Sequence, residues 1–396
     1  MSNRLDPVAR ARQLMRSLNR TRYGKRQILV ADFSDTLQGQ DTSRVIDLMP
    51  NRRGRFVFRV KYNTKSIDPL ASQKYGTPFF DVTKMSDKEV RDHLKREEFD
   101  FTLWFKHTKG FKFQRAMDYN VPFIVQVGGC NFHDGSETGG CHFCFVDNKS
   151  NDGRSGPGKV WPSATDCVDS FLAAREKIRK IYQERTGYDL QLKVIRISGG
   201  EPTMVLPWIV DLLLEIDNRY LSNDIVLQID TNLSTWNELD LGALYDLESW
   251  DAKFLAGMKG CDSANIAVNV QAAQTVSQQM LAFQGLVGCG LDVYPQMYNP
   301  NPHTLDVFCE LADEFCVKNF SKRLHIGPLK LYGPNRRRLE LEARNMEVEG
   351  YVDKTVESWH YNYQAAVKVM DCYLRQRYHV GYKDLVRSDV KLSVNI

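Results

Sequence analysis

Three cysteines stand close together in one stretch of the chain and could bind a metal. Cys130, Cys141 and Cys144 lie within residues 127–147, directly after an apolar run at 122–127 (PFIVQV) that is rich in β-branched residues. A run of this composition is typical of a buried strand. A strand that delivers three thiols at its carboxyl end predicts a metal site at the mouth of a parallel sheet.

Three thiols leave one position short of the four ligands that close a structural zinc or iron–sulfur site. His133 could supply the fourth ligand, because Cys130-x2-His133 followed by Cys141-x2-Cys144 has the spacing of a Cys3His zinc knuckle. This stretch alone leaves both kinds of site open. The decision depends on residues further along the chain.

A second motif follows the next strand. Residues 194–198 (VIRIS) form a short apolar run that leads directly into Gly199, Gly200, Glu201 and a proline. Two glycines let the backbone pass close to a ligand, and the glutamate offers an anion for an ammonium group. Together with the three cysteines, this GGEP motif resembles the radical S-adenosylmethionine (radical SAM) superfamily, which pairs a three-cysteine loop after its first strand with GGEP after its second.

The cysteine spacing differs from the usual pattern of that superfamily. The chain has CX10CX2C where CX3CX2C is usual, and the tight half, Cys141 to Cys144, is retained. Phe143 stands at the position that in the superfamily lies beside the adenine. The inserted residues, 131–140, belong to a glycine-rich and proline-free segment, so we expect the loop to bend back and bring Cys130 to the other two cysteines.

The resemblance implies a cofactor and a chemistry. It implies a [4Fe–4S] cluster held by Cys130, Cys141 and Cys144, whose remaining iron takes the amino and carboxylate groups of S-adenosylmethionine. Reductive cleavage of that cofactor gives methionine and a 5′-deoxyadenosyl radical, which abstracts a substrate hydrogen. The cofactor carries the hard chemistry, and the protein supplies ligation, orientation and exclusion of water. No catalytic residue is assigned.

Polar residues at later strand ends are the other candidates for cofactor binding. Within the superfamily they look most like the strand ends of the glycyl-radical-enzyme activating enzymes, with Leu233 where that group has a glycine and Gly257 where it has an acid. The zwitterionic methionyl end of the cofactor needs an anion, for which Glu201 is the candidate, and cations, for which Lys259 and Lys330 are candidates. The full set of these later candidates is Asp230, Thr231, Asn232, Lys259 and Lys330.

Strands and helices alternate from residue 122 onward, which indicates βαβ units and a parallel sheet. We expect an α/β fold: a partial (β/α)6 TIM-like barrel at 121–335, an α+β extension at 1–120 and a C-terminal helical extension at 336–396. The candidate residues then fall at the carboxyl ends of the strands, where barrel enzymes place their active sites. The six expected strands are 122–127, 194–198, 225–229, 254–258, 291–296 and 324–330.

The first 27 residues are strongly basic, with eight Lys or Arg residues against one acid. Val8, Ala11, Met15 and Leu18 share one helical face beside a basic row of arginines. We favour a helix docked on the core. A targeting helix and a contact with nucleic acid also fit, and the latter keeps an RNA-modifying enzyme open as an alternative function.

Composition bears on whether the protein binds membranes and on the compartment in which it works. The chain has 396 residues, a net charge of +4 and no apolar run near the ~18 residues that span a bilayer. We expect no membrane association. Six other cysteines lack close partners and are expected to be buried and free, which favours a reducing cytoplasm. Expected partners are an electron donor such as flavodoxin or ferredoxin and a small-molecule or peptide substrate. A non-catalytic, zinc-stabilised α/β binding protein is the alternative from another class.

Overall fold

The computed structural model describes most of the chain. The described residues are 5–33, 36–38, 44–50, 56–62, 122–186, 189–239, 241–248, 250, 252–385 and 387–395. The sequence also predicts a charged helix at 86–97 and an aromatic stretch at 99–113, and both lie outside the described residues.

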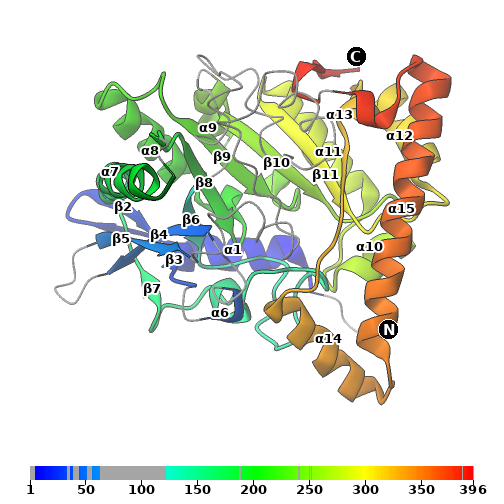
Figure 1. Ribbon diagram of the computed structural model, residues 1–396, viewed down its shortest axis with the longest axis horizontal. Helices are drawn as coiled ribbons and strands as arrows, with labels where there is room; N and C mark the ends of the chain where they lie inside the picture. Colours follow the sequence, from blue (N-terminus) through cyan, green and yellow to red (C-terminus); the bar gives the residue numbers. More distant parts are fainter. Residues whose placement is uncertain are drawn as a thin grey trace.

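Six parallel strands in chain order form the centre of the fold (Figure 1). Their order in the sheet equals their order in the sequence, so every polar residue at a strand's carboxyl end comes to the same edge. Each predicted strand from 122 onward is found, and only the last is much shorter than expected. The strands are β6 (Phe123–Val127), β8 (Val194–Gly199), β9 (Val226–Thr231), β10 (Ala252–Met258), β11 (Asp292–Tyr298) and β13 (His325–Gly327).

Strands from the N-terminal part extend the same sheet beyond β6. β4 (Arg44–Pro50) pairs in parallel with β6 and antiparallel with β5 (Phe56–Tyr62). The alternating run RFVFRVKY at 55–62 predicts a strand there, and β5 confirms it. The apolar run ILVADF at 28–33 also predicts a strand, but it contributes only the short strand β3 (Val30–Ala31), which lies antiparallel to β6 and to β7 (Lys159–Val160). A separate hairpin joins β1 (Asn19–Arg22) to β2 (Lys25–Ile28).

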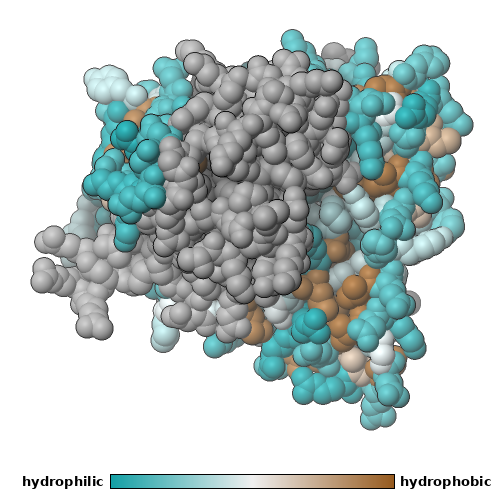
Figure 2. All heavy atoms as spheres, in the orientation of Figure 1, coloured by the Kyte–Doolittle hydropathy of each residue, from teal (hydrophilic) through white to brown (hydrophobic). Residues whose placement is uncertain are grey.

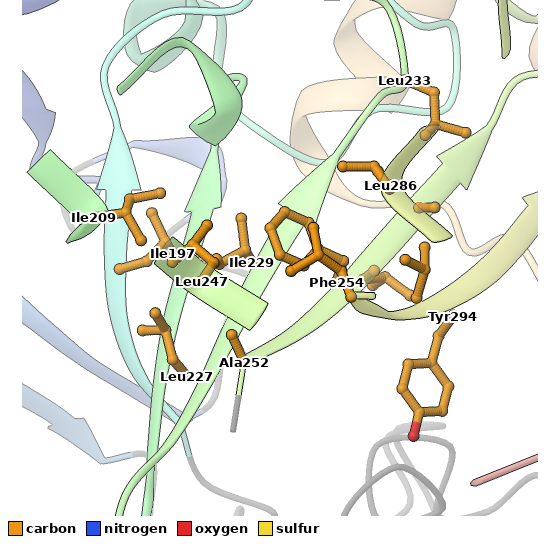
Figure 3. Packing of buried hydrophobic residues seen from close by; sticks show 14 of the residues in the cluster. Ile197, Ile209, Leu227, Ile229, Leu233, Leu247, Ala252, Phe254, Leu286 and Tyr294 are labelled. Carbon is orange, nitrogen blue, oxygen red and sulfur yellow. The ribbon is translucent and has the colours of Figure 1, made fainter. Parts of the chain in front are cut away.

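Helices cover one face of the parallel strands and create the main core. Figure 3 shows Ile197, Ile229 and Phe254 of the sheet packed against Ile209 and Leu247 of the helices. Because side chains alternate along a strand, the opposite face carries the intervening polar residues of β8 and β9. The covering helices include α7 (Ala164–Thr186), α8 (Leu206–Asn218), α9 (Leu241–Glu248), α11 (Val276–Gly288) and α12 (Leu305–Phe315).

The sequence predicts a helix that begins near Ser163, whose side chain can cap it, and ends before Gly187, and α7 confirms both ends. The Ser163 hydroxyl accepts a hydrogen bond from the Asp166 backbone N–H at 3.2 Å, and the Asp166 carboxylate accepts from the Ser163 N–H at 2.8 Å. This reciprocal pair satisfies two backbone donors that a helix start leaves open. The helix ends at Thr186, before the glycine that was expected to stop it.

Two C-terminal helices complete the molecule (Figure 1). α14 (Gly333–Met346) begins before the predicted boundary at 336, and α15 (Tyr351–Tyr378) packs against α12 and β13. Apolar residues recur at three- and four-residue intervals in this region and predict an amphipathic helix. Of these, Trp359, Met370 and Leu374 are buried, and Val356, Tyr363 and Val367 are half-buried. Figure 2 shows hydrophobic side chains reaching the surface beside these two helices.

The basic N-terminal helix α1 (Pro7–Leu18) is docked on the core, as expected, and its first turn is capped by Asp6. Its buried face is shifted slightly from the predicted one, because Leu14 is buried while Val8 and Met15 are only half-buried. Part of its charge is paired within the chain: the Arg12 guanidinium lies 2.7 Å from Glu238.

All nine cysteines are free thiols. Four of the six scattered cysteines are buried as predicted, whereas Cys316 is half-buried and Cys372 is exposed, so the prediction is wrong for Cys372. In the described part of the chain, no helix combines the length and apolarity needed to cross a membrane.

The docking of α1 can be tested with Leu14→Ala. Leu14 is 1% exposed and lies directly on Gly153, where an added Cβ would approach its side chain to 2.1 Å. A cavity at this contact should lower the free energy of unfolding by about 2–5 kcal/mol in urea titrations. Arg16→Ala, on the exposed face of the same helix, should change it by less than about 0.5 kcal/mol. Equal values for the two variants would contradict the docked position.

Candidate active site

The three predicted cysteines come together in one apolar cluster. Cys141 is buried there, and Cys130 and Cys144 are half-buried and pack against it. The Cys144 N–H donates to the Cys141 carbonyl at 3.0 Å, which closes a tight turn. The surrounding apolar side chains come from the loop itself and from later helices: Phe132, Phe143, Ile266, Val270, Leu339 and Trp359. Phe143, predicted to lie beside an adenine, has its ring 5.8 Å from that of Tyr298.

The inserted residues between the first two cysteines are anchored at both ends. Asn131 is fully buried; its amide donates to the Pro7 carbonyl at 3.0 Å and to the Ser234 hydroxyl at 2.7 Å. Further on, the Asn148 amide donates to the Glu137 carbonyl at 2.5 Å. These contacts tie the insertion to the start of α1, to the loop after β9 and to the residues just after Cys144.

The GGEP motif lies directly against the start of the cysteine loop. The Gly200 N–H donates to the Val127 carbonyl at 3.0 Å, and the Glu201 N–H donates to the Gly129 carbonyl at 2.8 Å. A Cβ on Gly200 would lie 1.7 Å from the Gly129 oxygen, and Gly199 has a φ of +95°. Both glycines are therefore required by the backbone, as the sequence suggested, but what approaches them is the cysteine loop.

Glu201 is fully buried and bonded within the protein. Its carboxylate accepts hydrogen bonds from the Thr231 hydroxyl at 2.8 Å and the Asn232 N–H at 2.7 Å, and also from the hydroxyl of Thr203. Burial raises the pKa of Glu201, while these hydrogen bonds act in the opposite direction. In this arrangement the carboxylate ties the end of β8 to the end of β9.

The polar residues at the carboxyl end of β9 divide between two environments. Asp230 points to the polar face of the sheet, where it is bonded to Arg196 at 2.8 Å and to Ser198 at 2.6 Å. Thr231 is bonded to Glu201, whereas Asn232 points to the cysteine loop, where its amide nitrogen lies 3.9 Å from the Cys130 sulfur. The structure therefore brings Asn232 to the thiols and places Asp230 in an ion pair.

Leu233 has a φ of +60°, in the left-handed region that favours glycine. This is the position at which the activating enzymes that the sequence resembles have a glycine. The chain keeps the same turn with a leucine, whose side chain is 2% exposed and part of the core. Burial of that side chain offsets the backbone strain.

Lys259 lies against two aromatic rings of the cysteine loop, whereas Lys330 is exposed. The Lys259 ammonium lies 5.8 and 5.9 Å from the ring centres of Phe132 and Phe143, and its charge acts on Cys141. Its backbone is held by the buried side chains of Gln279 and Asn269. Lys330 is exposed, on the segment that leads into α14.

Burial raises the pKa of the Cys130 thiol, and it raises the pKa of Cys141 to about 11, with Lys259 acting in the opposite direction. These two thiols are therefore protonated at neutral pH in the metal-free protein. Metal binding has to displace their protons.

His133 does not complete a zinc knuckle in this structure. Its Nδ1 accepts the Gly135 N–H at 3.1 Å, and burial lowers its pKa to about 4, so the ring is neutral. Among the described residues, no three His, Cys, Asp or Glu side chains are arranged as ligands of a metal ion. The cysteines are gathered but not closed around a common point.

The sequence did not reveal the part that α14 plays. Asn335 and Arg338 of this helix are buried and donate hydrogen bonds to backbone carbonyls of the cysteine loop. Four residues later, Glu342 lies 3.5 Å from His142. A cavity of about 500 Å³ opens between the loop and the two C-terminal helices, with Phe132 and Tyr351 in its wall. The spacing of 335, 338 and 342 is that of one helical face, but nothing in it names the partner.

The chain was compared with protein-family models, with curated proteins and with solved structures, and only solved structures gave matches. No protein-family model and no curated protein matches the chain. Among solved structures, it is similar to the cobalamin-dependent S-adenosylmethionine radical enzyme OxsB. The form with aqua-cobalamin bound gives a TM-score of 0.34 and 11% identity over 78% of this chain and 36% of that one. The apo form gives 0.34 and 12% over 62% and 39%. The chain thus spans well under half the length of OxsB, and likenesses of this size do not establish a family.

Gly200→Ala tests the contact between the two motifs. Its Cβ has no room beside the Gly129 oxygen, so the loop must move, and we expect a loss of about 2 kcal/mol or more in the free energy of unfolding. Gly288→Ala is the matched control, because its Cβ would meet only Val394 at 3.6 Å. Urea titrations in which both variants unfold like the parent would contradict the close approach.

Proposed function

We propose that this chain is a radical SAM enzyme built on a partial (β/α)6 barrel, with a [4Fe–4S] cluster on Cys130, Cys141 and Cys144. When bound, such a cluster supplies an open iron for S-adenosylmethionine and the electron that cleaves it to methionine and a 5′-deoxyadenosyl radical. The observation that carries the proposal is the convergence of the cysteine loop, the GGEP loop and Lys259 at the carboxyl ends of neighbouring strands.

The residues present fit this cofactor. A [4Fe–4S] cluster with one open iron needs three protein thiolates, and three thiols are gathered here in an apolar cluster. A structural zinc site needs four protein ligands. The bound cluster is anionic, and the Lys259 ammonium lies beside the Phe143 ring, where its charge acts on the Cys141 thiol. The apolar surroundings supply a dry site, as radical chemistry requires.

The roles of the other residues follow from their geometry. Lys259 is the cation placed to meet the carboxylate of S-adenosylmethionine, and Phe143 offers an aromatic face beside it. Glu201, Thr231 and Asn232 hold the loop backbones in register through the buried carboxylate. For Glu201, direct contact with the cofactor ammonium would require a change in these hydrogen bonds.

We propose a small polar molecule or a peptide as substrate and a flavodoxin or ferredoxin as electron donor. The polar face of the sheet supports the first, because Ser198, Gln228 and Asp230 line it near the strand ends. The RNA alternative has less support, since Arg12 and Arg26 of the basic segment are paired with Glu238 and Asp211.

Metal analysis after anaerobic reconstitution tests the proposal. The parent should bind about four iron atoms per chain, and Cys144→Ala should lose most of them. Exposed Cys372→Ser should keep the parent's iron content. His133→Ala should also keep it, because three thiolates suffice for the cluster. Zinc in the parent, lost in His133→Ala, would contradict the proposal and favour the zinc-stabilised binding protein.

A second experiment separates the two candidate lysines. In reconstituted protein, Lys259→Met should weaken S-adenosylmethionine binding about tenfold or more, because a hydrogen bond to a charged group contributes about 1.5–3 kcal/mol. Exposed Lys330→Met should change the Kd less than about threefold. Equilibrium dialysis with labelled cofactor measures both. Loss with Lys330→Met alone would reverse the assignment.

A further inference from the structure

We propose that Arg338 is a positioning residue for the cluster: it holds the Cys141–Cys144 half of the loop and places a buried positive charge beside the thiolates. This inference rests on the proposed function. It concerns a residue of α14, outside both sequence motifs.

Arg338 is bonded almost entirely to the loop. The side chain is 1% exposed, and its guanidinium donates to the Val146 carbonyl at 2.6 Å and to the carbonyl of Cys144. It also donates twice to the Asn148 side-chain oxygen, at 2.9 and 2.6 Å. One planar group thus holds the chain at three residues: Cys144, Val146 and Asn148.

The same contact reaches the inserted residues. Asn148 accepts from Arg338 with its oxygen and donates to the Glu137 carbonyl with its nitrogen. The tight cysteine pair and the insertion that returns from Cys130 are therefore held through one arginine. Asn335, one turn earlier on α14, adds a bond to the Phe143 carbonyl at 3.4 Å.

The charge of Arg338 has no counter-ion in the part of the chain that the structure describes. Among the described residues, no carboxylate lies within ion-pair distance of it, since Glu342 of the same helix is directed to His142 and Tyr351. Carbonyl and amide oxygens satisfy its hydrogen bonds but do not cancel its charge. A buried, unpaired cation is costly and favours an anion nearby. In the proposed enzyme, this anion is the iron–sulfur cluster bound by the neighbouring thiolates.

Three variants test the inference. Arg338→Met removes the charge and the hydrogen bonds, Arg338→Lys keeps the charge, and Arg336→Met removes an exposed arginine from the same helix. In iron-free protein, amide hydrogen exchange across residues 141–148 should be at least tenfold faster in both Arg338 variants and unchanged in Arg336→Met. Unchanged exchange in both Arg338 variants would overturn the holding role.

The midpoint potential of the bound cluster tests the charge. Loss of a nearby cation should favour the oxidised cluster at least tenfold in Arg338→Met, about 59 mV for one electron, with a much smaller shift in Arg338→Lys and Arg336→Met. Equal potentials in all variants would overturn the charge role. If Arg338→Met does not fold, the comparison of Arg338→Lys with Arg336→Met carries the exchange test, and Arg338→Gln, which keeps a hydrogen-bond donor but loses the charge, carries the charge test. A parent that binds no iron would refute the proposed function, while the exchange result would still decide the holding role.

Discussion

The backbone contact between Gly129 and the Gly200–Glu201 peptide is the constraint on which the site depends. It joins the loop after β6 to the loop after β8 at a separation that a side chain on Gly200 would prevent. The next residue, Glu201, then carries the connection to β9 through a buried carboxylate. Cys130 follows Gly129 directly, so the first thiol is placed by the same contact that aligns the three strand ends.

Two cations approach the gathered thiols from different elements. Lys259 comes from the end of β10, with its backbone held by buried amides, and Arg338 comes from α14. Burial raises the pKa of the Cys141 thiol, and the positive charges of both residues act to lower it. The site is therefore apolar enough to keep thiols protonated without metal, yet carries the positive charge that deprotonated thiolates need.

Much of this could be predicted from local sequence. The six parallel strands follow from short β-branched runs, and the motifs at their ends fall together because parallel strands end at one edge. Contacts between distant segments could not be predicted. The pairing of Arg338 with residues 144–148 has no local signal, and the bond network of Glu201 depends on a loop 30 residues away. The left-handed turn at Leu233 was invisible because its backbone is normally a glycine conformation, tolerated here through burial.

The central claim is that three thiolates hold an iron–sulfur cluster with one iron open to S-adenosylmethionine. The most direct measurement is electron paramagnetic resonance of the anaerobically reconstituted, dithionite-reduced protein, recorded with and without that cofactor. The account predicts a [4Fe–4S]+ signal that changes when S-adenosylmethionine is added, because the cofactor binds at the open iron. A cluster signal that the cofactor leaves unchanged, or no cluster signal with zinc found by elemental analysis, would contradict it.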